Sequence, residues 1–152
     1  MLKIPSKFSV LLSIVLSVLL FLFCIAGAVI MPEATDTLIH IVWTNIASWA
    51  RLYLIVLAYM ALAAVMFADV LLFSLLLRVR RGLVFTPASV AHIRGVSWCC
   101  MFLCAVFCGI GIYFKLAFVV AFGALFLGLC LRVVKNVIEE ATEIKSENDL
   151  TV

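Results

Sequence analysis

Long apolar stretches alternate with short polar ones along this chain, and the alternation predicts its architecture. Four stretches are long enough to cross a bilayer, because a helix needs about 20 apolar residues to span a hydrocarbon core about 30 Å thick. They cover Phe8–Met31, Leu52–Leu77, Val96–Tyr113 and Leu116–Val134. Because lipid offers the backbone no hydrogen-bond partners, each stretch is predicted to be a helix. The predicted fold class is all-α: a polytopic membrane protein with four transmembrane helices, forming a single membrane domain over residues 1–152.

The connection between the first two predicted spans has a pattern of its own. Its polar positions recur at steps of three and four residues, from Thr37 and His40 to Arg51, and apolar residues including Trp43 and Trp49 fill the intervals. This spacing predicts a short amphipathic helix at the outer interface, with both tryptophans at headgroup depth. Two interpretations stay open, because such a helix can pack across the outer ends of the spans or act as a lid that contacts a ligand.

The connection between the second and third spans carries signals for the end of one helix and the start of the next. Gly82 suits the left-handed position just past a helix C-terminus. Thr86 and Pro87 suit the N-cap and the first helical turn. The third helix is therefore expected to begin near Pro87, well before its apolar part starts at Val96.

Small and weakly polar side chains form one stripe on each of the last two predicted helices. They recur at steps of three and four residues, which places each set on one helical face. The stripes consist of Cys100, Cys104, Cys108 and Gly111 in the third helix, and Ala117, Ala121, Ala124 and Gly128 in the fourth. Small residues let the backbones of membrane helices approach closely. The third and fourth helices are therefore predicted to form a tight antiparallel hairpin.

Composition agrees with a membrane protein and limits the range of functions. The 152 residues are 68% hydrophobic and 12% charged, whereas soluble domains have about 45–50% apolar and about 25% charged residues. Four spans leave only the tail, residues 135–152, as a sizeable polar segment. The chain has no phosphate-binding loop, nucleophile elbow, zinc-protease motif or paired carboxylates. We therefore expect neither an enzyme nor a cofactor.

The distribution of basic residues predicts the orientation. Nine lysines and arginines fall on the side of the two termini and the second connection, and only Arg51 and Lys115 fall on the other. Basic residues collect on the cytoplasmic side, so both termini are predicted to be cytoplasmic. The first apolar stretch exceeds the 7–15 residues typical of a signal-peptide core and is expected to remain as a helix.

Asp69 is the one ionisable residue well inside a predicted span. An aspartate at the middle of a span costs about 2.5–3.5 kcal/mol on insertion scales, and such residues usually face other helices and mark a site. One interpretation is a proton or cation site, or half of an ion pair with Arg94 or Arg132. The other is a structural hydrogen bond to Ser97 or to a cysteine thiol.

All six cysteines lie inside predicted spans, where they act as small, soft packing residues. A metal site on the cysteine stripe is the weaker interpretation, because His40 and His92 both lie outside the apolar spans. A closed zinc site needs four ligands in tetrahedral geometry. No metal is therefore expected.

Two short segments carry a family resemblance. One is residues 81–87 (RGLVFTP), followed by Arg94-Gly95, and the other is the tail, residues 146–152 (SENDLTV). With four spans in about 150 residues, the chain resembles the domain-of-unknown-function 2975 family of small four-helix integral membrane proteins of bacteria. The resemblance implies a bacterial plasma-membrane protein. Genes of the family often lie beside the gene of a small Cro/Xre-type helix-turn-helix regulator, so the resemblance also implies a membrane sensor or partner of that regulator.

The partner hypothesis places the contacts on the cytoplasmic side. The chain itself is not expected to bind nucleic acid directly, and the bilayer is its other partner. The candidate contact residues are Arg78, Arg80, Arg81, Phe85, Glu147, Asn148, Asp149 and Leu150. The arginines also have a simpler explanation as the topology signal. The alternative function is a small transporter or channel subunit, alone or as a homo-oligomer, with Asp69 in the path.

Overall fold

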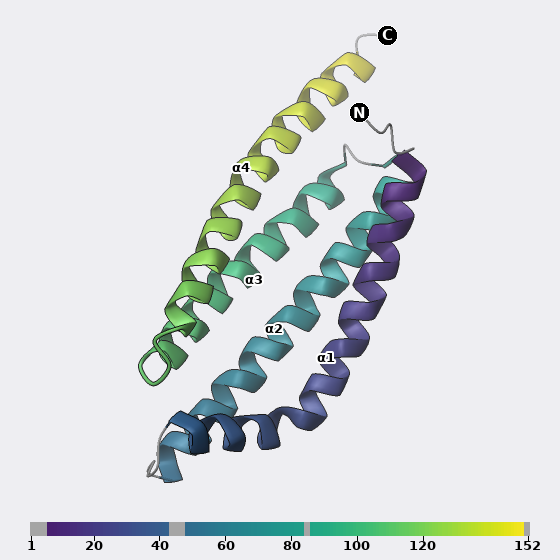
Figure 1. Ribbon diagram of the computed structural model, residues 1–152. Coiled ribbons are helices and arrows are strands. Elements are labelled where there is room, and N and C mark those ends of the chain that lie inside the picture. The colour runs from purple at the N-terminus through teal and green to yellow at the C-terminus, as the bar shows by residue number, and fades with distance from the viewer. Residues whose placement is uncertain (1–5, 43–47, 84–85, 151–152) are drawn as a thin grey trace, which may run out of the picture.

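The regular structure of the described chain is helical. The computed structural model describes residues 6–42, 48–83 and 86–150. Its helices are α1 (Ser6–Val42), α2 (Ser48–Arg80), α3 (Pro87–Gly111) and α4 (Ala117–Leu150), as Figure 1 shows. Each is long and apolar enough to cross a membrane. The predicted all-α class with four candidate spans is confirmed, and the chain is a multi-pass membrane protein by this criterion.

The four helices lie in chain order as an open row (Figure 1). Among the described residues α1 packs only against α2, α2 also packs against α3, and α4 packs only against α3. Large apolar side chains stay exposed along all four helices. In lipid these side chains meet surroundings as apolar as themselves, so no hydrophobic force closes the row into a bundle.

The two ends of the row differ in what they carry. The start of α1, the α2–α3 connection and the end of α4 lie at one end, which we call the tail end (Figure 1). The end of α1, the start of α2 and the α3–α4 connection lie at the other, which we call the turn end. The helices are thus antiparallel to their neighbours, and the start of α1 and the end of α4 lie on the same side of the row.

α1 bends at the turn end, and its last turns cross toward the start of α2 (Figure 1). Pro32 lies inside α1, and a proline inside a helix removes a backbone hydrogen bond and kinks the helix. The bent part packs on α2, with Ile39 and Ala50 both buried. The Asp36 carboxylate accepts two hydrogen bonds from the Arg51 guanidinium, from Nε and from Nη2, each at 2.6 Å.

This bend changes the picture of the predicted amphipathic segment. α1 does not end at Met31 but continues through Pro32 to Val42, so Thr37 belongs to the bent part of α1 and Arg51 to the first turns of α2. Trp43 lies outside the described residues. The described part of the segment therefore belongs to the ends of two long helices, and α1 reaches into it because Pro32 lies inside the helix without ending it.

The α2–α3 connection follows its local sequence signals. Gly82 has a φ of +75°, and its N–H and that of Leu83 bond back to carbonyls of the last turn of α2 at 3.0 Å each. This is the Schellman arrangement, which favours glycine because other residues are strained at positive φ. Thr86 caps α3 by accepting a hydrogen bond from the Ser89 N–H, and Pro87 follows in the first turn. Both predictions for this connection are confirmed.

α3 and α4 form a close antiparallel hairpin. The Ser97 hydroxyl donates a 2.8 Å hydrogen bond to the Gly128 carbonyl across the interface. A Cβ on Gly128 would lie 3.2 Å from the Cys100 Cβ, so the two backbones approach as closely as a glycine permits. Ala117 and Ala121 are buried in the same region of the chain.

Candidate functional site

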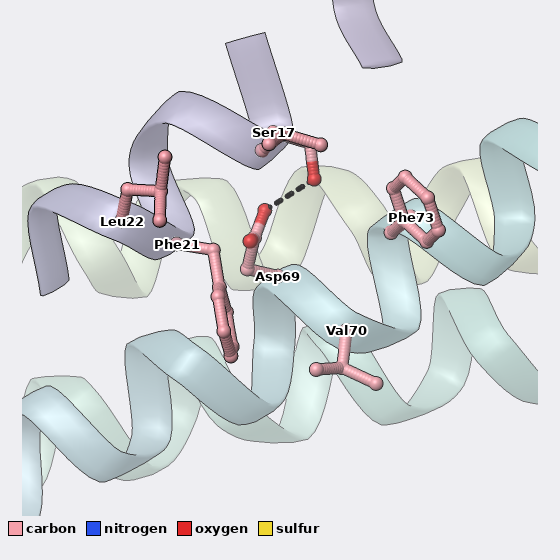
Figure 2. Close-up of a pocket in the computed structure, with 7 residues that line it drawn as sticks. Ser17, Phe21, Leu22, Asp69, Val70 and Phe73 are labelled. Carbon is pink, nitrogen blue, oxygen red and sulfur yellow. Dashed lines mark hydrogen bonds between the residues drawn. The ribbon is translucent and has the colours of Figure 1, made fainter. Parts of the chain in front are cut away.

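Asp69 lies on the face of α2 that meets α1, and it is buried. Its side chain and that of Ser17 are each only 4% exposed. The Ser17 hydroxyl donates a 2.7 Å hydrogen bond to Asp69 Oδ1, as Figure 2 shows. This bond joins α1 to α2, and the two bonded residues are 52 positions apart in sequence.

The positions of the two residues along their helices explain why they meet. Ser17 lies 11 residues after Ser6, the first residue of α1, and Asp69 lies 11 residues before Arg80, the last residue of α2. Because α1 and α2 are antiparallel neighbours, both side chains lie about 16 Å along the helix axis from the tail end. Equal depth in adjacent antiparallel helices is the sequence signal that identifies Ser17 as the partner.

Apolar cavities flank the pair on both sides. One has a volume of about 270 Å³ and is lined, besides the pair, by Val18, Phe21, Leu22, Val70 and Phe73; Figure 2 shows this side. The other, about 220 Å³, is lined by the pair with Ser13, Leu16, Leu20, Leu72 and Leu76. A carboxylate with a hydroxyl donor in such surroundings can hold a proton or fasten two helices together. A hard cation such as Ca²⁺ needs six to eight oxygen ligands, so this pair alone is a poor cation site.

The two arginines proposed from the sequence as ion-pair partners of Asp69 are engaged elsewhere. Arg94 donates to Glu139 on α4 at 3.3 Å. The Arg132 guanidinium carbon lies 4.9 Å from the centre of the Trp98 ring. Both arginines belong to the α3–α4 hairpin, whereas Asp69 faces α1 on the opposite side of α2. The interpretation of Asp69 as half of an ion pair with Arg94 or Arg132 is therefore wrong.

The hydrogen bond proposed from Ser97 to Asp69 is also wrong. Ser97 is 1% exposed, and its hydroxyl is directed to α4, where it donates to the Gly128 carbonyl. Ser17 of α1 donates to Asp69 instead, and no local pattern in the sequence predicted this contact.

The predicted packing residues lie along the α3–α4 hairpin with different degrees of exposure. Gly111 is buried, and a Cβ there would come within 2.8 Å of the Phe118 ring. Gly128 is buried against Cys100. Of the others, Ala117 and Ala121 are buried, Ala124, Cys100 and Cys104 are half-buried, and Cys108 is exposed. Among the described residues, no three histidine, cysteine or acidic side chains are grouped as a metal site would require.

The candidate partner-contact residues lie at or beyond the tail end. Arg78 is half-buried at the end of α2, and Arg80 and Arg81 are exposed. Phe85 lies outside the described residues, and so do the side chains of Glu147, Asn148, Asp149 and Leu150.

α4 extends beyond its apolar part as a helical arm, which we define as residues 137–150. α4 contains 34 residues, whereas about 20 suffice to span the hydrocarbon core. The arm adds about 21 Å of helix, and Figure 1 shows it continuing past the start of α3. At the base of the arm, Glu139 pairs with both Lys135 and Arg94.

A family comparison identifies the relatives of the chain. The sequence profile described as "Protein of unknown function (DUF2975)" matches residues 40–152. The chain belongs to this family. The match confirms the family assignment made from the sequence, and it covers α2, α3 and α4. Ser17 and most of α1 precede it. Comparisons with curated proteins and with solved structures found no match.

Proposed function

We propose that this DUF2975 protein is a membrane-bound interaction protein that acts at its tail end as a sensor or partner of a small cytoplasmic helix-turn-helix regulator of the Cro/Xre type. The observation that carries the proposal is the α4 arm. A span needs no such extension, and a helix that projects from the membrane offers a surface to a soluble protein.

The chemistry of the arm suits a basic partner. Glu140 is exposed on it, as are two apolar side chains, Val137 at 60% and Ile144 at 54%. Proteins that bind DNA carry basic surfaces that neutralise phosphates. An acidic helix with exposed apolar residues can therefore attract such a surface and dock against it in the manner of a helix laid in a groove.

The distribution of basic residues supports the orientation that the proposal requires. Arg78, Arg80 and Arg81 lie at the tail end, and such residues favour the cytoplasmic side. The tail end, with the arm, is therefore proposed to face the cytoplasm, and the membrane to be the bacterial plasma membrane.

A cavity at the turn end supports the sensor part of the proposal. It measures about 340 Å³ and is mainly apolar, and it is lined by residues of the bent part of α1, of α2 and of the α3–α4 hairpin. A compound that filled it would contact Leu38 of α1, Leu54 of α2 and Phe114 of the hairpin turn together. Because the Ser97–Gly128 bond ties α3 to α4, a shift of the hairpin at the turn end would move the arm at the tail end. Such a compound must bind two arrangements of the hairpin with different affinity to act as a signal.

The test is photo-cross-linking of the full-length protein in native membranes. A photoreactive residue replaces Glu140 on the arm, and the control replaces the exposed Leu116 at the turn end. We expect a small basic cytoplasmic protein, identified as a DNA-binding regulator by mass spectrometry, to be captured from position 140 and not from position 116.

Charge variants sharpen this test. Glu140→Lys reverses a charge on the arm and should lower cross-linking from a second photoreactive residue at Ile144, whereas Lys145→Glu makes the arm more acidic and should preserve or increase it. Equal capture from both ends of the protein, or no capture of a basic protein from the arm, would overturn the proposal.

Buried Asp69 is the observation that favours the alternative, a small transporter or channel subunit. One chain forms an open row in its described part, so a path past Asp69 would need a homo-oligomer. Under this alternative Asp69→Asn abolishes ion flux in reconstituted vesicles and removal of the arm leaves flux unchanged. Under the interaction proposal the arm deletion is the damaging change, and Asp69→Asn retains partner capture.

A further inference from the structure

Three basic side chains from two helices converge on one cavity at the tail end. The cavity lies between α3 and α4 and measures about 270 Å³. Arg94 of α3 and Arg132 and Lys135 of α4 line it, together with Ser97, Trp98 and Asn136. The Asn136 amide adds a neutral hydrogen-bond donor, so the cavity combines positive charge with donors in the way that anion sites require.

The acidic side chain beside the cavity offsets only part of its charge. Glu139 accepts hydrogen bonds from Arg94, at 3.3 Å, and from Lys135. Among the described residues Arg132 has no acidic partner, and its guanidinium is held over the Trp98 ring. One carboxylate against three cations leaves the cavity with excess positive charge. The Lys135 side chain is only 16% exposed, so part of this charge is shielded from water.

The position of the cavity along α4 places it where lipid headgroups lie. Arg132 lies near the end of the apolar stretch of α4 and Lys135 directly after it, and both precede the arm. Basic pockets between membrane helices at this level suit phosphate-bearing headgroups. The 59% exposed Trp98 ring is a typical interfacial side chain, apolar with one polar N–H.

An apolar groove continues from the same tryptophan into the membrane. It lies between α2 and α3 and measures about 550 Å³. Its lining consists of Met60, Ala63, Ala64, Phe67, Gly95, Trp98, Cys99 and Phe102. Trp98 borders both spaces, and the groove extends from Gly95 toward Phe102, away from the tail end. A charged cavity at the surface, followed by an apolar groove running inward, is the shape that a phospholipid fills.

We propose that this part of the protein is a binding site for one anionic phospholipid. The phosphate binds among Arg94, Arg132 and Lys135, and an acyl chain lies along the α2–α3 groove past Trp98. Inorganic phosphate has the same charged chemistry, but it would leave the groove empty. The groove is the observation that favours a lipid.

The test uses quenching of Trp98 fluorescence by brominated lipid. Trp43→Phe and Trp49→Phe leave Trp98 as the one tryptophan of the full-length protein. This protein is reconstituted into vesicles that contain equal mole fractions of brominated phosphatidylglycerol or brominated phosphatidylcholine in an unlabelled zwitterionic background. We expect stronger quenching by the phosphatidylglycerol. Each basic side chain in the cavity should contribute about fivefold to the preference, because a surface Lys or Arg attracts anionic lipid with about 1 kcal/mol.

Matched charge variants make the result specific. Arg94→Gln, Arg132→Gln and Lys135→Gln together should abolish the preference for phosphatidylglycerol. Arg78→Gln, Arg80→Gln and Arg81→Gln remove the same charge at the same end of the row outside the cavity, and they should preserve it. Equal quenching by the two lipids, or equal loss in both triple variants, would overturn the proposal. If inorganic phosphate abolished the preference, the cavity would be a site for soluble phosphate and the lipid assignment would be wrong.

Discussion

The hydrogen bond between Ser17 and Asp69 makes a quantitative prediction about stability. Ser17→Ala removes a hydroxyl that donates a hydrogen bond to the Asp69 carboxyl, and Asp69→Ala removes the acceptor. Interhelical hydrogen bonds in membrane proteins contribute about 0.6 kcal/mol on average and about 1.7 kcal/mol at most. The 2.7 Å distance and the 4% exposure of both residues place this bond in the upper part of that range. We therefore expect a coupling energy of roughly 1–1.7 kcal/mol between the two substitutions.

The assay is a double-mutant cycle on the free energy of unfolding, measured by titrating the protein in mixed micelles with sodium dodecyl sulfate. The matched control pairs Asp69→Ala with Ser97→Ala. Ser97 bonds to α4 instead, so these two substitutions should be additive within about 0.3–0.5 kcal/mol. A coupling of Asp69 with Ser97 that exceeded its coupling with Ser17 would refute the assigned partner and the order of helices in the row.

Two further predictions concern the hairpin and the bend. Gly128→Ala places a Cβ 3.2 Å from that of Cys100, whereas Gly123→Ala meets nothing within 4 Å. Both variants gain the same helix propensity from alanine. Because only Gly128→Ala crowds the interface, that variant should be less stable than Gly123→Ala by about 1–3 kcal/mol in the same titration. Equal stability would mean that α3 and α4 are not in close contact at Gly128. Arg51→Gln breaks the exposed pair with Asp36, and exposed ion pairs contribute little to global stability. It should therefore accelerate amide hydrogen exchange only in the bent end of α1, and acceleration throughout α2 would contradict this.

Local signals in the sequence predicted the helices and one of their connections. Apolar stretches of sufficient length identified four helices, because lipid leaves the backbone no other way to satisfy its hydrogen bonds. Gly82 and Thr86 were predicted as the end and the cap of helices because each acts on its own backbone within a few residues. These features depend on neighbours in sequence, so they are visible without a structure.

The partner of Asp69 and the shape of α1 depend on other information. The sequence marked Asp69 as buried, but its partner follows from which helix lies on which side of α2, and no local pattern gives the order of a row. Comparing depths along adjacent helices would have suggested Ser17. Pro32 was placed just outside the first predicted span, yet α1 continues through it, because a proline can kink a long helix without ending it.

The side of the membrane on which the arm lies is the most direct test of the proposed role. Alkaline phosphatase becomes active only outside the cytoplasm. Green fluorescent protein becomes fluorescent in the cytoplasm, and it stays dark when the general secretion pathway exports it. Each reporter is fused after Val152, and each is also inserted into the α3–α4 turn at Lys115, in separate full-length proteins. We expect fluorescence from the fusion after Val152 and phosphatase activity from the insertion at Lys115. Phosphatase activity from the fusion after Val152 would place the arm outside the cell and contradict a cytoplasmic regulator as its partner.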